Sequence, residues 1–273
     1  MAQASPTSNA SHASPTPHAA QRLAGHSALI SGGASGCGAA ASRLFAAEGA
    51  RVTIVDRQVD LGEALAAELR AAGLQATFAA ADVSQRDQIE SAVAHATATF
   101  GAPTVLFNHA GTIVVKPFLE TTDAEYDSLM DINVRSMFMM TRAVLPGMLA
   151  AGGGRIVCTS SISAIAATPN EVLYNLTKGA VHMFARAIAV EFRDRGIRCN
   201  AVCPGFIETP HGLREVEALT RYGVDVSEAA IRAAQGRMCR PEEVASAALF
   251  LASDESSFVN GTHLFVDNGF TAV

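Results

Sequence analysis

Apolar and β-branched residues gather in short runs, and longer Ala- and Leu-rich stretches separate these runs from residue 26 onward. The runs predict seven strands, at 27–31, 51–56, 75–83, 104–111, 154–160, 197–205 and 262–269. Two intervening stretches with helical periodicity, 39–49 and 61–73, end at a glycine. Strands that are apolar on both faces and alternate with helices are typical of βαβ units. The pattern therefore predicts an α/β protein with a doubly wound parallel sheet and helices on both faces.

The start of the chain lacks this pattern. Residues 1–22 are mainly Ala, Ser, Thr, Pro and His, with no charged residue before Arg22. Such a segment cannot bury apolar surface, and it has neither the basic nor the apolar region of a signal peptide. We expect residues 1–22 to be a disordered extension and 23–273 to form one domain. Within it, the charged stretch 206–236 lies between a strand and the helical segment 240–253, as substrate lids often do.

Composition narrows the possible classes of protein. The 273 residues are 49% hydrophobic, enough for a substantial core, and the net charge of −6 argues against a nucleic-acid partner. No run approaches the roughly 18 apolar residues of a membrane span, so no membrane association is expected. The five cysteines form no CxxC pair: Cys37, Cys158, Cys199, Cys203 and Cys239. We expect reduced, packed thiols in a cytoplasmic protein, with no metal site.

Four glycines fall within the octapeptide 31–38, directly after the first predicted strand. This loop is either a flexible turn or a phosphate-binding loop at the start of a helix. In the second case Gly32 permits the tight turn, Gly36 lets the backbone approach a pyrophosphate, and Gly38 lets helix and strand pack closely. Asp56 ends the next strand 18 residues after Gly38, near the spacing of a ribose-binding acid, although it could instead cap the following helix.

A second candidate site lies at the ends of later strands, where open α/β sheets bind their ligands. Polar residues follow three of these strands, at 108–111, 159–163 and 203–209. Tyr174 and Lys178 are four residues apart on a predicted helix and therefore share a face. A nearby ammonium lowers the pKa of a phenol, which suits a tyrosine for general acid–base catalysis, although a lone pair of this kind is often accidental.

Together these motifs resemble the short-chain dehydrogenase/reductase family over about residues 25–270. The resemblance rests on the glycine loop with Ser31 in the usual Thr position, Asn108-His109-Ala110-Gly111, Asn133, Ser161 placed 13 residues before Tyr174, Lys178, and Pro204 to Thr209. His109 and Cys37 depart from the family pattern at non-catalytic positions. The resemblance implies a single-domain, Rossmann-type sheet and a nicotinamide cofactor.

The resemblance also implies a catalytic tetrad of Asn133, Ser161, Tyr174 and Lys178. Tyr174 would exchange a proton with the substrate oxygen, and Ser161 would hydrogen-bond that oxygen. Lys178 would tune Tyr174 and hold the nicotinamide ribose, and Asn133 would hold a water molecule. Ser160 points to the opposite face of its strand and is expected to be structural.

The cofactor contacts implied by the resemblance surround the same strand ends. They are Ser31, Gly32, Ser35, Gly36, Cys37, Gly38, Asp56, Arg57, Asp82, Val83, Asn108, Ala110, Gly111, Tyr174, Lys178, Pro204, Gly205, Ile207 and Thr209. Asp56 would accept hydrogen bonds from the adenosine ribose and repel a 2′-phosphate, and Ser35 also favours NAD. Arg57 leaves NADP possible as the alternative.

The leading hypothesis is an NAD-dependent alcohol, polyol or sugar dehydrogenase that acts on a secondary alcohol or its ketone. A 3-oxoacyl-carrier-protein reductase using NADPH and a non-catalytic dinucleotide-binding regulator are the alternatives. The candidate substrate-pocket residues are Ser163, Glu171, Phe206, His211 and 213–222; Glu171 would bond a polyol hydroxyl or cap its helix. Apolar residues on several faces of 172–192, and the methionines within 124–150, predict a homotetramer or homodimer.

Overall fold

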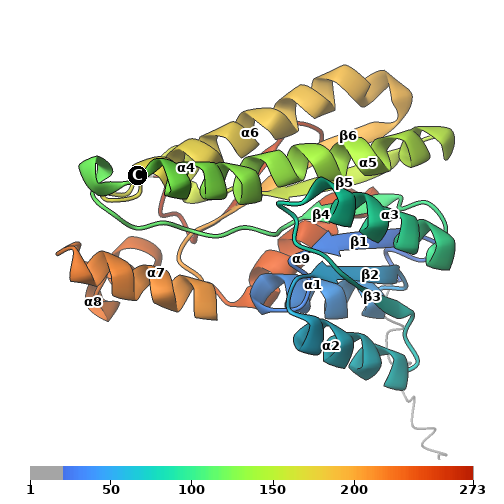
Figure 1. The fold of residues 1–273 in the computed structure, drawn as a ribbon, viewed down its shortest axis with the longest axis horizontal. Helices are drawn as coiled ribbons and strands as arrows, with labels where there is room; N and C mark the ends of the chain where they lie inside the picture. The colour runs from blue at the N-terminus through green and yellow to red at the C-terminus, as the bar shows by residue number, and fades with distance from the viewer. Residues whose placement is uncertain (1–20, 273) are drawn as a thin grey trace, which may run out of the picture.

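A seven-stranded parallel sheet in the order β3-β2-β1-β4-β5-β6-β7 forms the centre of the computed structural model, which describes residues 21–272 (Figure 1). The strands are β1 (Ser27–Ser31), β2 (Arg51–Asp56), β3 (Ala76–Ala80), β4 (Val105–Asn108), β5 (Gly154–Thr159), β6 (Ile197–Pro204) and β7 (His263–Val266). The predicted order of elements and the parallel sheet are confirmed. The strands β3, β4 and β7 are shorter than their apolar runs, because the last residues of each run leave the sheet as loops.

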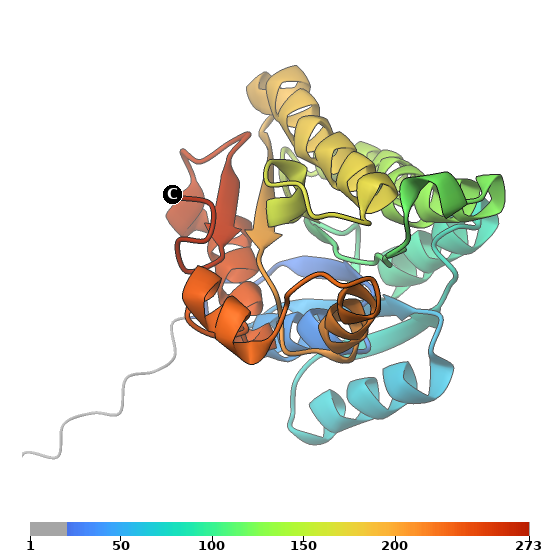
Figure 2. The same cartoon turned by 90° about the vertical axis from the view of Figure 1, so that its left-hand side faces the viewer.

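Helices cover both faces of this sheet (Figures 1 and 2). They are α1 (Gly36–Ala47), α2 (Val59–Ala71), α3 (Arg86–Phe100), α4 (Asp123–Met130), α5 (Ser136–Ala150), α6 (Val172–Phe192), α7 (Pro210–Arg221), α8 (Glu228–Gln235) and α9 (Pro241–Ala252). Residues of α1, α2 and α9 pack in one hydrophobic cluster, and those of α3, α5 and α6 pack in the other. In β1, Ile30 belongs to the first cluster and Leu29 to the second, so the strand is buried on both faces.

The order of the sheet fixes where a ligand can bind. Strand β1 pairs with β2 on one side and β4 on the other, so the direction of winding reverses beside β1. The register aligns Ser31 with Val55 and with Asn108, which brings the ends of these strands level. Ligands of doubly wound sheets bind in the crevice at this switch point.

The predicted insertion, 206–236, folds mainly as the helices α7 and α8. The side chain of Thr209 caps α7 by accepting a hydrogen bond from the Gly212 N–H at 3.1 Å, and Pro210 follows at the first helical position, where it costs no hydrogen bond. Leu219 and Ile231 anchor the two helices with buried side chains. Movement of this segment on ligand binding stays a prediction.

Further expectations concern the start of the chain, the cysteines, and possible membrane-spanning or metal-binding segments. Residues 1–20 of the expected extension lie outside the described residues, whereas Arg22 belongs to the fold and pairs with Glu48 at 2.7 Å. All five cysteines are buried, as expected. Within residues 21–272, no helix is long and apolar enough to span a membrane, and no cluster of three His, Cys, Asp or Glu could hold a metal ion.

The prediction that the methionines of 124–150 form a contact with another subunit is wrong. The side chains of Met137, Met139, Met140 and Met148 are buried within the subunit, against the sheet, and need no partner chain. Helix α6 does expose a second apolar surface. Its exposed residues are Val172, Leu176, Met183 and Val190.

Candidate active site

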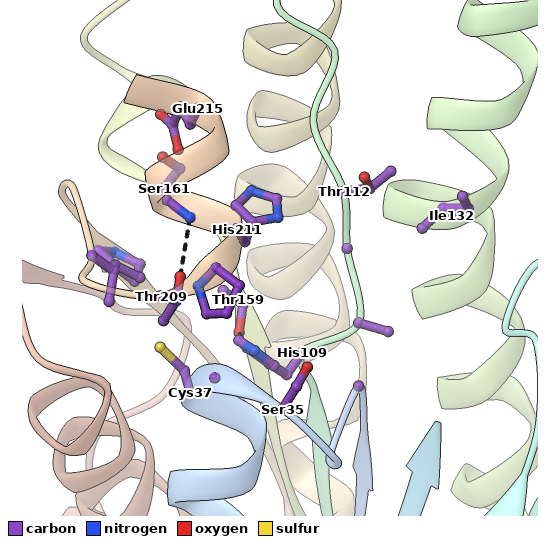
Figure 3. Close-up of a pocket in the computed structure, with 18 of the residues that line it drawn as sticks. Ser35, Cys37, His109, Thr112, Ile132, Thr159, Ser161, Thr209, His211 and Glu215 are labelled. Atoms are coloured by element: carbon purple, nitrogen blue, oxygen red, sulfur yellow. Dashed lines mark hydrogen bonds between the residues drawn. The ribbon is translucent and has the colours of Figure 1, made fainter. Parts of the chain in front are cut away.

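A cavity of about 700 Å³ lies at the carboxyl ends of the strands and is closed on one side by α7. The loops after β1 to β6 all contribute to its wall. Figure 3 shows Ser35 and Cys37 from the glycine loop, Thr159 and Ser161 from the end of β5, and Glu215 from α7 around this cavity. Its size suits a dinucleotide cofactor together with a small substrate.

The glycine loop is tightly packed and adopts a conformation that other residues would strain. Gly32 has a φ of +66°, and a Cβ there would lie 2.8 Å from the Cα of Ala110. A Cβ at Gly38 would overlap the carbonyl oxygen of Gly32. The close helix–strand packing expected of Gly38 is therefore present, and a flexible turn is excluded.

The beginning of α1 supplies the donors that a pyrophosphate needs. Ser35 is the N-cap residue, but its side chain makes no capping hydrogen bond, and the first turn contains no acidic residue. The first N–H groups of a helix lack partners within the helix and carry the positive end of its dipole. Because Ser35, Gly36 and Cys37 line the cavity, these donors fit a phosphate-bearing cofactor.

Asp56 joins the end of β2 to the glycine loop. Its side chain is 6% exposed; one carboxylate oxygen accepts from the Ala34 N–H at 3.1 Å and the other from the Gln58 N–H at 3.0 Å. Helix α2 has Gln58 as its N-cap residue, so Asp56 does not occupy the capping position. Asp56 and the exposed Arg57 both line the cavity, where either can meet the adenosine ribose of a bound dinucleotide.

Three of the four predicted catalytic residues meet at the cavity wall. Helix α6 carries Tyr174 and Lys178 on one face, and both side chains are buried. The Lys178 ammonium donates to the Thr159 carbonyl oxygen at 3.0 Å and lies 5.4 Å from the centre of the Tyr174 ring. Ser161 follows β5, and its hydroxyl oxygen accepts from the Ser163 N–H at 3.1 Å.

The charges around Tyr174 differ from the expectation. Burial raises the pKa of Tyr174 well above its usual value of 10, and the carboxyls of Glu215 and Glu171 raise it further. The Ser161 hydroxyl opposes this shift. Burial also lowers the pKa of Lys178 to about 8. The net shift in the pKa of Tyr174 is therefore upward, opposite to the lowering expected from Lys178.

Asn133 lies behind the cavity wall rather than in it. It belongs to a π-helical turn, Asp131–Arg135, that joins α4 to α5. Its amide accepts from the Thr112 N–H and donates to the Thr112 carbonyl, both at 2.8 Å, and also donates to the Thr177 hydroxyl at 3.1 Å. Asn133 thus ties the loop after β4 to α6. A bound water at Asn133 stays a prediction.

Most of the expected cofactor residues line the cavity. They are Gly32, Ser35, Gly36, Cys37, Asp56, Arg57, Asp82, Val83, Ala110, Gly111, Tyr174, Lys178, Pro204, Gly205, Ile207 and Thr209. Gly38, Ser31 and Asn108 lie behind the wall. The Ser31 hydroxyl accepts from the backbone N–H groups of His109 and Ala110, at 3.1 and 3.2 Å, and so holds the loop after β4 in place. The Asn108 amide donates to the Thr141 hydroxyl at 2.9 Å.

The substrate side of the cavity contains Ser163, Phe206 and His211, as expected. Ser160 donates its hydroxyl to the Lys178 carbonyl at 3.1 Å, consistent with a structural residue. Glu171 is fully buried, makes no capping hydrogen bond and does not line the cavity.

The predicted substrate segment 213–222 contributes Arg214 and Glu215 to the cavity wall, although sequence reasoning did not single out Glu215 within it. A helix beginning at Pro210 would have placed Glu215 on the same face as His211, four residues earlier.

This arrangement can perform proton exchange beside a bound dinucleotide. The Tyr174 hydroxyl can act as the acid or base, the Ser161 hydroxyl can hydrogen-bond the same substrate oxygen, and Lys178 can supply positive charge. Burial and the charge of Lys178 lower the pKa of His109 to about 3, so its imidazole is neutral near neutral pH.

Comparison with known proteins finds related oxidoreductases that match along nearly the whole chain. A family model described as enoyl-(acyl carrier protein) reductase matches residues 32–271. Cyclopentanol dehydrogenase from Comamonas sp. (strain NCIMB 9872) is 40% identical over 249 residues, which cover 89% of this chain and 96% of that protein. A 2,5-dichloro-2,5-cyclohexadiene-1,4-diol dehydrogenase from Sphingobium indicum is 36% identical over 252 residues, covering 92% of this chain and 98% of the relative.

Solved structures show the same fold. The crystal structure of levodione reductase superposes with a TM-score of 0.87 at 34% identity, covering 92% of this chain and 99% of that one. The glycine loop, the positions of Ser161, Tyr174 and Lys178, and these similarities along nearly the whole chain lead to one assignment. The chain belongs to the short-chain dehydrogenase/reductase family.

Proposed function

We propose that this protein is an NAD-dependent dehydrogenase that interconverts a small secondary alcohol and its ketone. One observation carries the proposal: Ser161, Tyr174 and Lys178 line the same cavity as the glycine loop and Asp56. Catalytic and dinucleotide-binding groups therefore face a shared space at the switch point of the sheet. The similarity to named alcohol and diol dehydrogenases supports the reaction type.

The chain's own residues account for proton movement. During alcohol oxidation the Tyr174 hydroxyl oxygen takes the substrate hydroxyl proton, and during reduction it returns that proton. The Ser161 hydroxyl hydrogen-bonds the reacting oxygen, where negative charge develops. Lys178, fixed by the Thr159 carbonyl, stabilises the deprotonated Tyr174. The nicotinamide ring, when bound, supplies hydride chemistry.

Asp56 supports NAD over NADP. Its carboxylate is held between the glycine loop and the start of α2, so it cannot turn away without breaking two hydrogen bonds. Neutral ribose hydroxyls would donate to it, whereas a 2′-phosphate would be repelled. Arg57 is exposed and could pair with a phosphate, which is the competing effect.

Cofactor turnover with a panel of alcohols tests the proposal. Purified protein is incubated with NAD or NADP and cyclopentanol, cyclohexanol or primary alcohols, and reduced cofactor is followed by absorbance. We expect NAD reduction with secondary cyclic alcohols. Cofactor binding without turnover in either direction would instead indicate a regulator, and NADPH-dependent reduction of 3-oxoacyl thioesters alone would indicate an acyl-carrier-protein reductase.

We also propose that the protein is a homo-oligomer that uses α6. The exposed fractions of Leu176, Met183 and Val190 are 52%, 60% and 64%, unusually high for apolar residues spread along one long helix. A second copy that packed against this surface would bury them. Light scattering coupled to size exclusion is expected to give a dimer or tetramer, and a monomer at micromolar concentration would contradict this.

A further inference from the structure

Glu215 is a carboxyl in the cavity wall that the proposed mechanism does not use. It lies on α7, is half-buried, and shares a helix face with His211. Among residues 21–272 it makes no side-chain hydrogen bond and no ion pair, although burial raises its pKa to about 7 and the charge of Lys178 opposes that shift. A carboxyl in this position has acceptor capacity that only a bound molecule or water can use.

A second carboxyl, Glu171, interacts electrostatically with Glu215 from another element. Glu171 precedes α6 and is fully buried, and neither of its carboxyl oxygens has a hydrogen-bond partner in the described part of the chain. Burial and the charge of Glu215 raise its pKa to about 8. Both carboxyls also raise the pKa of Tyr174, whose hydroxyl is the proposed acid or base.

We propose that Glu215 is a specificity-determining residue whose carboxyl binds a second hydroxyl of the substrate, so that the enzyme prefers a diol or polyol to the mono-alcohol of the same skeleton. Glu215 from α7 and Tyr174 from α6 line the same cavity, so one substrate molecule can reach both. Figure 3 shows Glu215 and Ser161 in the wall of this cavity. This inference rests on the proposed dehydrogenase function.

The carboxyl of Glu215 suits a hydroxyl better than an ionic group at this subsite. In its ionised form it would repel a carboxylate or phosphate on the substrate, whereas Arg214 and Lys178, which also line the cavity, would attract one. An ammonium would need a fully ionised partner, whereas burial favours the neutral form of both carboxyls. His211 provides no positive charge, because burial lowers its pKa to about 4. A hydroxyl can donate to a carboxylate and accept from a carboxylic acid, so it suits either state.

Paired substrates and a matched variant test the proposal. The ratio of kcat/KM for 1,2-cyclopentanediol to that for cyclopentanol is measured with NAD for the unmodified protein, Glu215→Leu and Glu217→Leu. Glu217 lies on the same helix, is exposed and does not line the cavity, so its variant controls for the loss of a charge on α7. NADH binding, followed by fluorescence, reports whether each variant retains the folded cofactor site.

We expect the unmodified protein to have a ratio above one. In Glu215→Leu this ratio is expected to fall roughly ten- to a hundredfold, the size of one lost hydrogen bond to a charged group. In Glu217→Leu it is expected to stay the same. If Glu215→Leu does not fold, Glu215→Gln, which keeps size and one acceptor, is expected to lower the ratio severalfold. A ratio that does not change in the Glu215 variants overturns the inference while the dehydrogenase assignment stands. No oxidation of either alcohol, or of any other in the panel, overturns the proposed function itself.

Discussion

Replacing Asp56 by Asn removes the charge that faces the adenosine ribose while preserving most of the local structure. The Asn side-chain oxygen can still accept the hydrogen bond that Asp56 accepts from the buried Ala34 N–H at 3.1 Å, whereas its NH2 group cannot replace the oxygen that accepts from the Gln58 N–H. A smaller residue such as Ser would leave that N–H unpaired, at a cost of about 1–3 kcal/mol in the glycine loop. Asp56→Asn therefore separates the effect of charge from the effect of loop support.

The size of the effect follows from Coulomb's law. Two unit charges 4 Å apart repel by about 4 kcal/mol at an effective dielectric constant of 20. Arg57, exposed at the same end of the cavity, recovers part of this for a 2′-phosphate. We therefore expect the unmodified protein to prefer NAD over NADP by roughly ten- to a thousand-fold in kcat/KM.

Steady-state kinetics with both cofactors and one alcohol checks this expectation. Asp56→Asn is expected to shrink the preference mainly by raising kcat/KM for NADP, with little change in kcat. Arg57→Ala is the matched variant and is expected to widen the preference by weakening NADP. Equal or better use of NADP by the unmodified protein would refute the reasoning and show that Arg57 governs this end of the site.

Three other predictions address stability and movement. The folded-state pKa of Glu171 is about 8 instead of 4.5, so its ionisation favours unfolding as pH rises from 5 to 8. Over that range the unfolding free energy of Glu171→Gln is expected to rise relative to that of the unmodified protein, by up to about 1.4 kcal/mol per pH unit. Denaturant titrations in which this difference does not change with pH would contradict the prediction. Gly38→Ala is expected to lower stability by about 1–3 kcal/mol and weaken NADH binding, because the new Cβ meets the Gly32 carbonyl. Gly179→Ala is the control, since its Cβ would meet nothing within 4 Å, and thermal unfolding is expected to show no loss of stability. Amide exchange in 206–236 is expected to slow when NAD binds, and equal strong protection in both states would show a rigid segment.

The sequence predicted the parts of the molecule that depend on local pattern. The short runs of residues that are apolar on both faces predicted the parallel sheet, and the spacing of Tyr174 and Lys178 predicted that they share a face of one helix. The spacing to Tyr174 selected Ser161 over Ser160; both line the cavity, but Ser160 also donates its hydroxyl to the Lys178 carbonyl of α6. These features need only strand and helix periodicity.

Features that depend on long-range packing could not be predicted. The methionines of α5 were predicted to form a second apolar face for another subunit, but Met137 and Met140 pack in the subunit's own core. The π-helical turn that aims Asn133 at the Thr112 backbone has no local signature. The electrostatic interaction between Glu171 and Glu215 depends on the tertiary placement of α6 and α7, which no local pattern encodes. Their combined effect with burial on Tyr174 reversed the pKa shift expected from Lys178 alone.

The most direct test of the account is turnover by Tyr174→Phe, which removes only the hydroxyl from a buried ring. If this hydroxyl exchanges the substrate proton, kcat for alcohol oxidation falls about 10²- to 10⁴-fold. NADH affinity and thermal unfolding, measured on the same preparation, are expected to change little, because the ring still fills its place. Near-normal turnover in Tyr174→Phe would contradict the assignment of the active site.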